Sequence, residues 1–438
     1  MRRLALLSTV AAAVVGFASC TGAERPRVEA CAGAPSASFG TATAEPSEPL
    51  LGLLRPPNES AILARFDPLS LEPVSRQVQV PEYHDAWSVS PDGSQLALGI
   101  SSGRSLISPS RRLSGRIGIL IVDLKEMKVV GEVETGIAAE GLAWLAPRLL
   151  VAALQRGGTV LVDPLTGRIL RRWPALSEPQ ASARTPDGLV MLFPGVLPAT
   201  PEATAGARLG VVDPRGRLRS VTLERIQLAL RDGVQWDGAG LAVDTARARA
   251  YVFAADAPAA EVDLGTMRVS YHRLESLSLS PGELGGSEVP SDDELIWRSR
   301  RALWLGDGHV LVIGHDGLEA AGGEDFVAIA AGTTLVDTAT WSSCVLDARA
   351  GGAEFVAGRV LVYGRGDPAG RGLRGYTVAG REAFHLFDRE QVLDVQAAPD
   401  LAYVRTRTAV HVVEVMTGKV VSEIVPPVEL VDVVAGPS

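Results

Sequence analysis

The feature that most constrains the fold is a hairpin that recurs along the chain, and residues 158–173 show it most clearly. An apolar run at residues 159–162 is followed by a turn from Asp163 to Gly167 and then by a second run. The Asp163 side chain can accept a backbone hydrogen bond two residues on and so close a tight turn. Gly167 can adopt the positive φ that such a turn requires. Aliphatic and β-branched residues on both sides favour strands, so the segment predicts a β-hairpin.

Copies of this hairpin occur throughout the chain. Their turns lie at Asp67, Asp123, Asp213, Asp263, Asp337, Gly380 and Glu414. A second type of hairpin alternates with the first and is marked by the Ser-Pro-Asp-Gly sequence of residues 90–93, with relatives at residues 185–188 and 305–308. Two alternating hairpins make a four-stranded unit with a spacing of roughly fifty residues, which is the period of propeller blades.

The turns at residues 90–93 and 163–168 resemble those of WD40-like, YVTN-type and PQQ-like β-propeller repeats. The resemblance extends over residues 50–434, nearly all of the chain that would remain after removal of an N-terminal signal peptide. It implies an all-β fold: a β-propeller of four-stranded antiparallel blades, eight by hairpin count. Seven blades are the alternative if the region 275–300 or a degenerate copy is miscounted. The resemblance implies no particular function, because propellers host many unrelated activities.

The two ends of this region are expected to meet in one blade. Residues 50–54 and the Asp67 hairpin supply three strands, and the apolar run 428–434 has no local partner. Pairing the last run with the first completes a blade and removes the exposed edges of an open sheet. The propeller domain is therefore predicted to span residues 50–436.

Residues 1–20 have the features of a bacterial lipoprotein signal peptide. Arg2 and Arg3 precede an apolar stretch at residues 4–18 that is too short to span a bilayer comfortably. Residues 17–20, Phe-Ala-Ser-Cys, resemble a lipobox, although Phe17 stands where Leu is usual. The resemblance implies export, lipidation of Cys20 and attachment to the membrane of the cell envelope through that lipid. Plain secretion with cleavage nearby is the alternative.

Residues 21–49 are rich in Ala, Pro and Ser and lack the apolar density of a core, which predicts a disordered stalk. Cys31 in this stalk and Cys344 are the two cysteines that remain once Cys20 carries lipid. An even pair in an oxidising compartment predicts a disulfide between them. Two free thiols are the alternative.

Charge and motifs limit the partners and cofactors. The net charge of −9 lacks the basic footprint of a nucleic-acid binder, so no nucleic-acid partner is expected. His309 and His315 would lie on one side of a strand but about 20 Å apart, so no metal site is predicted. Trp173 falls two positions late for the docking repeat of quinoprotein dehydrogenases, which the Asp163 turn otherwise resembles. No cofactor is therefore predicted. The remaining strand histidines are expected to be structural: His272, His385 and His411.

The mouth of the central channel is the expected ligand surface, because the segments that enter each innermost strand of a propeller line one face. Here these segments combine aromatic, arginine and carboxylate side chains, which are common anchors of binding sites. The candidate ligand-binding residues are His84, Asp85, Trp87, Glu140, Gln180, Trp236, Asp237, Arg298, Arg300 and Asp394. The alternative is that each Trp packs between blades and each charge caps a strand.

The favoured function is a non-catalytic envelope scaffold that binds a protein, peptide or glycan, since the common catalytic motifs are missing. One alternative is a propeller enzyme, lactonase-, lyase- or quinoprotein-like, with an acid/base pair such as His84 and Asp237 in the channel. Another is a subunit that docks into a larger envelope complex. Residues 276–294 form a long insertion that either carries binding or is a solvated loop without a role.

Overall fold

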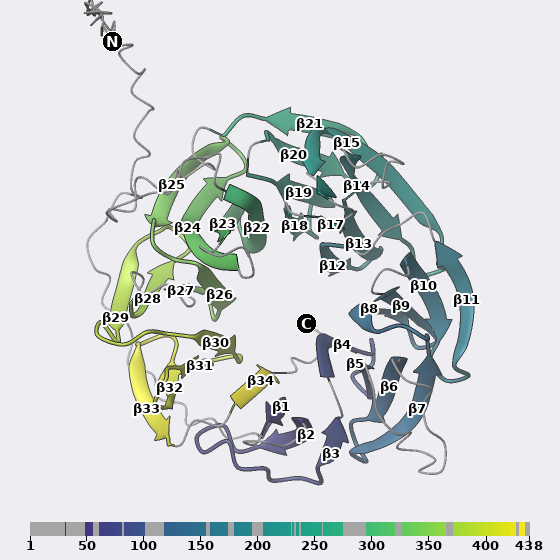
Figure 1. The fold of residues 1–438 in the computed structure, drawn as a ribbon, viewed down its shortest axis with the longest axis horizontal. Helices are drawn as coiled ribbons and strands as arrows, with labels where there is room; N and C mark the ends of the chain where they lie inside the picture. Colours follow the sequence, from purple (N-terminus) through teal and green to yellow (C-terminus); the bar gives the residue numbers. More distant parts are fainter. Residues whose placement is uncertain are drawn as a thin grey trace, which may run out of the picture.

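The computed structural model describes residues 31, 49–55, 61–80, 83–100, 118–154, 158–173, 179–194, 205–228, 230–231, 234–235, 238–255, 257–274, 295–319, 326–364, 371–425 and 429–433. These residues form eight four-stranded sheets and one two-stranded sheet. The four-stranded sheets stand side by side in a ring, and the region about its central axis is called the channel below (Figure 1). This arrangement is an eight-bladed β-propeller, which confirms the predicted fold and blade number. No helix in this part of the chain is long and apolar enough to cross a membrane.

Each blade is numbered here in chain order, with its strands given from the channel outward. Blade 1 contains β34 (Glu429–Val433), β1 (Leu50–Arg55), β2 (Ala61–Phe66) and β3 (Val78–Val80). Blade 2 contains β4 (Tyr83–Val89), β5 (Gln95–Ile100), β6 (Gly118–Asp123) and β7 (Lys128–Glu134). Blade 3 contains β8 (Ala139–Ala146), β9 (Leu149–Leu154), β10 (Gly158–Asp163) and β11 (Arg168–Trp173). Blade 4 contains β12 (Ala181–Thr185), β13 (Gly188–Phe193), β14 (Ala205–Val212) and β15 (Leu218–Leu228).

The second half of the ring follows the same plan. The short pair β16 (Leu230–Arg231) and β17 (Val234–Gln235) precedes it. Blade 5 contains β18 (Gly240–Asp244), β19 (Arg249–Phe253), β20 (Ala259–Asp263) and β21 (Val269–His272). Blade 6 contains β22 (Leu295–Gly306), β23 (His309–Glu319), β24 (Phe326–Asp337) and β25 (Ser342–Asp347). Blade 7 contains β26 (Gly352–Val356), β27 (Arg359–Tyr363), β28 (Leu373–Thr377) and β29 (Glu382–Leu386). Blade 8 contains β30 (Asp394–Ala397), β31 (Leu401–Arg405), β32 (Val410–Glu414) and β33 (Lys419–Ile424).

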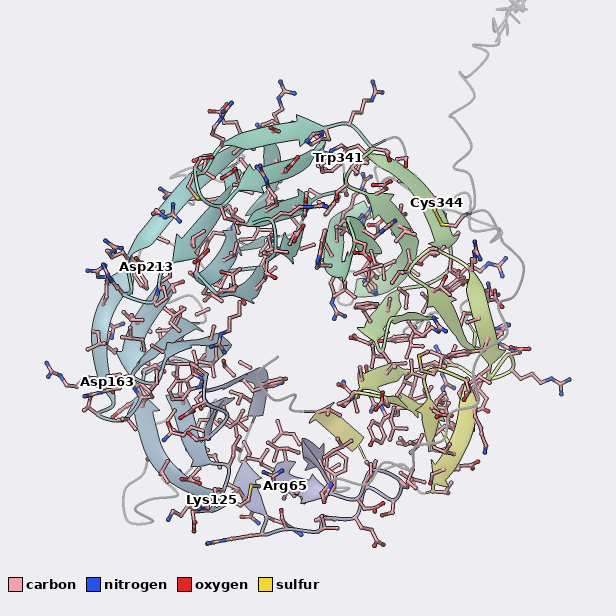
Figure 2. All side chains as sticks on the ribbon, turned by 180° about the vertical axis from the view of Figure 1, so that it is seen from behind. Arg65, Lys125, Asp163, Asp213, Trp341 and Cys344 are labelled. Atoms are coloured by element: carbon pink, nitrogen blue, oxygen red, sulfur yellow. A yellow bond between two sulfur atoms is a disulfide. The ribbon has the colours of Figure 1, made fainter. Side chains whose placement is uncertain are left out.

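The turn aspartates close the outer hairpins as their spacing predicts. The Asp163 carboxylate accepts a hydrogen bond of 3.1 Å from the N–H of Leu165, and Asp213 accepts one of 2.9 Å from the N–H of Arg215. Asp263 accepts one of 2.8 Å from the N–H of Thr266, three residues on. Figure 2 shows Lys125, Asp163 and Asp213 in turns at successive positions round the periphery of the ring. Because each bond joins residues that are close in sequence, these turns are specified by short stretches of the chain.

A few residues after the aspartate, these turns contain a residue whose backbone has a positive, left-handed φ. Gly167 has φ +68° and its N–H bonds to the Asp163 carbonyl at 2.9 Å. In other blades Met267 and Trp341 occupy the same place, with φ +59° and +58°. Their N–H groups bond to the carbonyls of Asp263 and Asp337, both at 2.7 Å. Glycine is therefore not required there, because the turn hydrogen bonds offset the strain of a positive φ.

The hydrophobic core lies between neighbouring blades. Eight clusters of buried residues each draw on two adjacent blades, from the blade 1–blade 2 interface round to the blade 8–blade 1 interface. The inner strands approach closely: a Cβ on Gly240 of blade 5 would lie 2.5 Å from the backbone N of Ala302 in blade 6. Stability is thus shared among eight similar interfaces and depends on all of them being formed.

The ring is closed by the two ends of the propeller. β34 pairs antiparallel with β1, with Gly52 opposite Val433 and Leu54 opposite Leu430. β34 thereby supplies the innermost strand of blade 1, as predicted. Cys31 and Cys344 form a disulfide with their Cα atoms 4.9 Å apart. The Cys31 N–H also bonds to the Val345 carbonyl at 3.2 Å, so this part of the N-terminal segment is fixed to the outer edge of blade 6.

Candidate functional site

The connections between strands are divided between two faces of the ring. Neighbouring strands of a blade run antiparallel. The connections from first to second and from third to fourth strand therefore lie on one face, which we call the turn face. The connections from second to third strand, and from each blade to the next, lie on the opposite loop face.

The two faces differ in the length of their connections. Turn-face connections are mostly tight, as at residues 124–127, 164–167 and 307–308, and the longest is residues 67–77. Both turn types recognised in the sequence lie there. The strand ends at the loop face are joined by the longest segments of sequence, residues 101–117, 194–204, 273–294 and 364–372, most of which lie outside the described residues. Binding residues in many folds lie on such connections above a rigid scaffold.

The candidate residues predicted from sequence lie toward the loop face. His84, Asp85 and Trp87 lie in β4, Glu140 in β8, Gln180 just before β12, Arg298 and Arg300 in β22, and Asp394 at the start of β30. Trp236 and Asp237 lie outside the described residues. The described candidates thus come from the innermost strands of five blades, around the channel.

Residues 238–239 join three of these blades. The Gln180 side-chain oxygen accepts a hydrogen bond of 3.1 Å from the N–H of Ala239. The Gly238 N–H donates to the Arg298 carbonyl at 2.8 Å, and the Arg300 N–H donates to the Gly238 carbonyl at 3.0 Å. Blades 4, 5 and 6 are therefore tied together beside the channel through Gln180, Arg298 and Arg300.

The Arg300 side chain is held inside blade 6. Its guanidinium lies 2.8 Å from Asp316, and both side chains are 3% exposed. It also donates to the carbonyl of Ser299 at 2.9 Å. A buried pair of this kind is costly to break, because the remaining charge would be left without its partner. The pair therefore positions the inner strands of blade 6.

Two other candidates also have intramolecular contacts. Trp87 is half-buried and packs against the core cluster between blades 1 and 2. The Asp394 carboxylate accepts a hydrogen bond of 3.1 Å from the Gln396 amide. These contacts fix the orientation of side chains that border the channel.

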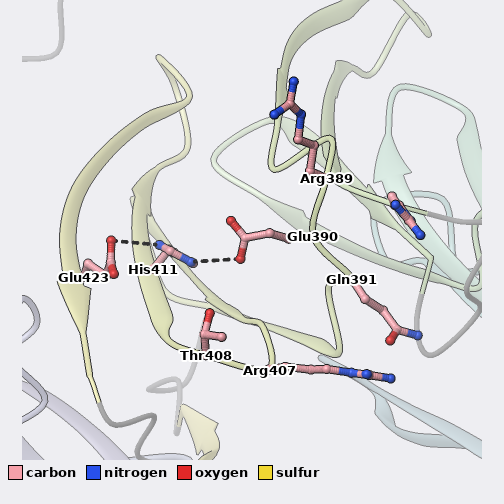
Figure 3. Close-up of a pocket in the computed structure, with 8 residues that line it drawn as sticks. Arg389, Glu390, Gln391, Arg407, Thr408, His411 and Glu423 are labelled. Atoms are coloured by element: carbon pink, nitrogen blue, oxygen red, sulfur yellow. Dashed lines mark ion pairs between the residues drawn. The ribbon is translucent and has the colours of Figure 1, made fainter.

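A pocket opens on the loop face between blades 7 and 8. Its volume is about 570 Å³. It is lined by Arg371 from the β27–β28 connection, residues 389–391 from the β29–β30 connection, and Arg407 from the β31–β32 turn. His411 of β32 and Glu423 of β33 complete one wall (Figure 3).

Sequence reasoning missed this pocket and assigned His411 a structural role. His411 is 7% exposed, and its ring lies 4.5 Å from that of Phe387. A structural role alone leaves its Nε2 atom unexplained, since Nε2 is buried and has no hydrogen bond among the described residues. The available signal was the presence of an arginine at each of three successive loop-face connections of blades 7 and 8.

The described residues contain no group of three or more His, Cys, Asp or Glu side chains arranged to hold a metal ion. No family model matches the chain, and no curated protein matches its sequence. Solved structures do match. NirN, a dihydro-heme d1 dehydrogenase in complex with DHE, is 14% identical with a TM-score of 0.56, over 89% of this chain and 75% of that one.

Two further matches have similar coverage. Apo AztD from Citrobacter koseri is 13% identical with a TM-score of 0.50, over 89% of this chain and 98% of that one. BamB from Moraxella catarrhalis is 13% identical with a TM-score of 0.45, over 80% of this chain and 92% of that one. The likeness to NirN and AztD is a likeness of fold alone. At this identity the likeness carries nothing about the ligand of this propeller.

Proposed function

We propose that this chain is a non-catalytic lipoprotein of the bacterial cell envelope whose propeller binds a protein, peptide or glycan through its loop face. The observation that carries the proposal is the separation of the two faces. The turn face is built mainly of short turns that repeat from blade to blade, whereas the long and dissimilar connections lie on the loop face.

A rigid base supports these connections. Every blade is a complete four-stranded sheet, and residues 238–239 tie blades 4, 5 and 6 together beside the channel. A preorganised surface loses little conformational entropy when a partner binds. The candidate residues around the channel, together with Trp236 and Asp237, are the proposed contacts, except Arg300, whose side chain is buried against Asp316.

The proposed anchor is a lipid on Cys20, followed by the stalk of residues 21–49. The disulfide gives this tether a short reach. At about 3.5 Å per extended residue, the chain from Cys20 to Cys31 spans at most about 40 Å. Since Cys31 is bonded to Cys344 in blade 6, the outer edge of that blade would stay within this distance of the membrane.

A propeller enzyme is the second candidate. NirN is named as a dehydrogenase, so the fold is compatible with catalysis as well as with binding. In this chain the proposed acid/base pair is His84 and Asp237. The observation that favours it is the position of His84 at the loop-face end of β4, beside the channel.

The test uses two sets of variants of the chain from residue 21. A loop-face variant combines His84→Ala with Asp237→Ala. A turn-face control combines Lys125→Ala with Arg215→Ala, both exposed residues of tight turns. Each immobilised protein is incubated with detergent-solubilised envelope extract, and the captured partner is quantified by mass spectrometry.

We expect the loop-face variant to retain about a tenth or less of the partner, as for the loss of a binding hot spot. The turn-face control should retain all of it, and both should unfold at the temperature of the unchanged protein. Equal capture by the two variants contradicts the proposal. A turnover that disappears in His84→Ala or Asp237→Ala without a change in melting temperature would show that the protein is an enzyme.

A further inference from the structure

The pocket between blades 7 and 8 has an acidic wall. The His411 ring lies between two glutamates: Nε2 is 3.7 Å from Glu390 Oε2, and Nδ1 is 3.8 Å from Glu423 Oε2 (Figure 3). The Glu390 side chain is 40% exposed and the Glu423 side chain is 58% exposed. Both carboxylates therefore remain accessible while the imidazole beneath them is buried.

The hydrogen bonding of the His411 ring is incomplete. The two carboxylate distances exceed the length of a normal hydrogen bond. Buried polar atoms in proteins nearly always have a hydrogen-bond partner, yet Nε2 has none among the described residues. A donor or acceptor group entering the pocket beside Glu390 would supply this missing contact.

The rest of the rim is basic. Arg371, Arg389 and Arg407 are exposed, and none of them forms an ion pair with a described residue. In Figure 3 the Arg407 side chain extends away from His411. Arg389 and Arg407 lie on opposite sides of Glu390. Guanidinium groups bind carboxylates through paired hydrogen bonds, so this rim favours a carboxylate.

We propose that this pocket binds a small free amino acid with an additional carboxylate, of the glutamate or aspartate type. The ammonium group would contact Glu390, on the side of His411 where Nε2 lacks a hydrogen bond, and the carboxylates would contact the arginines. A dicarboxylate without an amine is disfavoured by Glu390, and an amine without a carboxylate is disfavoured by the arginines. The volume of about 570 Å³ lies in the usual range for small-molecule sites. The proposal does not depend on the larger partner of the loop face.

Calorimetric titration tests the proposal with three matched probes. L-glutamate carries both kinds of charge, glutarate lacks the ammonium group, and butylamine lacks the carboxylates. We expect saturable binding of glutamate to the intact chain. Glutarate and butylamine should bind at least about tenfold more weakly, the effect of losing one charge-assisted contact.

Variants assign the charges to residues. In Glu390→Gln, glutamate should bind more weakly and glutarate more tightly, so that their dissociation constants come within about threefold of each other. The substitution removes a negative charge that attracts the ammonium group of glutamate and repels glutarate. Arg407→Ala should weaken the binding of both glutamate and glutarate. The controls Glu126→Gln and Arg268→Ala, at exposed positions of the turn face, should change neither.

The titrations and the variants give results that either support or overturn the proposal. Glutarate that binds as tightly as glutamate to the unchanged protein would overturn the proposal, as would the absence of glutamate binding. Glutamate binding that is unaffected by Glu390→Gln and Arg407→Ala would place the site elsewhere and also overturn it. All these residues are partly or fully exposed, so the variants are expected to fold, and their melting temperatures verify this.

Discussion

The phenolic hydroxyl of Tyr403 donates a hydrogen bond of 2.9 Å to the carbonyl oxygen of Pro68, a residue 335 positions earlier in the chain. Tyr403 lies in blade 8 and Pro68 in the turn between β2 and β3 of blade 1. The Tyr403 ring also packs edge-on against Phe66, with ring centroids 6.3 Å apart. Burial raises the pKa of Tyr403, which keeps the hydroxyl protonated and able to donate. The ring is therefore joined by side chains as well as by the pairing of β34 with β1.

Tyr403→Phe tests this junction. We expect the free energy of unfolding to fall by about 1–3 kcal/mol, because the buried Pro68 carbonyl loses its donor. Tyr271→Phe is the matched control, since the Tyr271 hydroxyl only accepts an exposed hydrogen bond of 3.3 Å from the Arg225 N–H. Denaturant unfolding measures the free energy of unfolding of both variants. Equal effects of the two substitutions would contradict a specific role for Tyr403.

The disulfide should contribute to stability as well as to attachment. Cys344→Ser, or reduction of the unchanged protein, removes a cross-link between residues 313 apart in sequence. We expect a loss of about 2–4 kcal/mol, mainly because the unfolded chain gains conformational freedom. The Cys20→Ser variant serves as the control. Alkylation of Cys31 and Cys344 in the native protein before reduction would contradict the cross-link.

The turn aspartates make stability depend on pH. A backbone hydrogen bond from Ser70 lowers the pKa of Asp67 below its ordinary value of 3.8, and one from Arg217 does the same for Asp213. A backbone hydrogen bond from Thr266 lowers the pKa of Asp263. As pH falls below 3.8, the unfolded state binds protons first. Stability that is fully present above that pH is then lost progressively down to the lowered folded-state values.

Denaturant midpoints measured from pH 7 to pH 2 check this dependence. We expect a plateau above about pH 5 and a steep fall below about pH 4. Asp213→Asn removes one titrating group, so its curve should fall less steeply than that of the unchanged protein. Stability that rises as the pH is lowered through this range would be the opposite sign and would refute the argument.

The fold could be predicted from the sequence because its signals are local. Each aspartate forms its turn hydrogen bonds within five residues, so the pattern at Asp163 or Asp263 is complete within a short stretch. The left-handed residues Met267 and Trp341 were less visible, since glycine is the usual sequence signal for a positive φ. The pairing of β34 with β1 could be inferred because residues 428–434 had no local partner.

The site was only partly predictable. The loop-face position of Gln180 and Arg298 follows from their place before or within the innermost strands. The burial of Arg300 against Asp316 depends on the register of β22 and β23, which the sequence pattern does not specify. The pocket combines Arg371, residues 389–391 and His411 from two blades. Only the packing of blade 7 against blade 8 brings these residues together.

The account depends most on the claim that the loop face contacts the partner. Site-specific photo-crosslinking in cells that produce the protein tests this directly, with a photoreactive residue placed at position 84 or 407 on the loop face and at position 125 or 215 on the turn face. Blots and mass spectrometry then record the adducts. We expect adducts with a partner from positions 84 and 407 and none from positions 125 and 215. Adducts that form mainly from the turn-face positions would contradict the account.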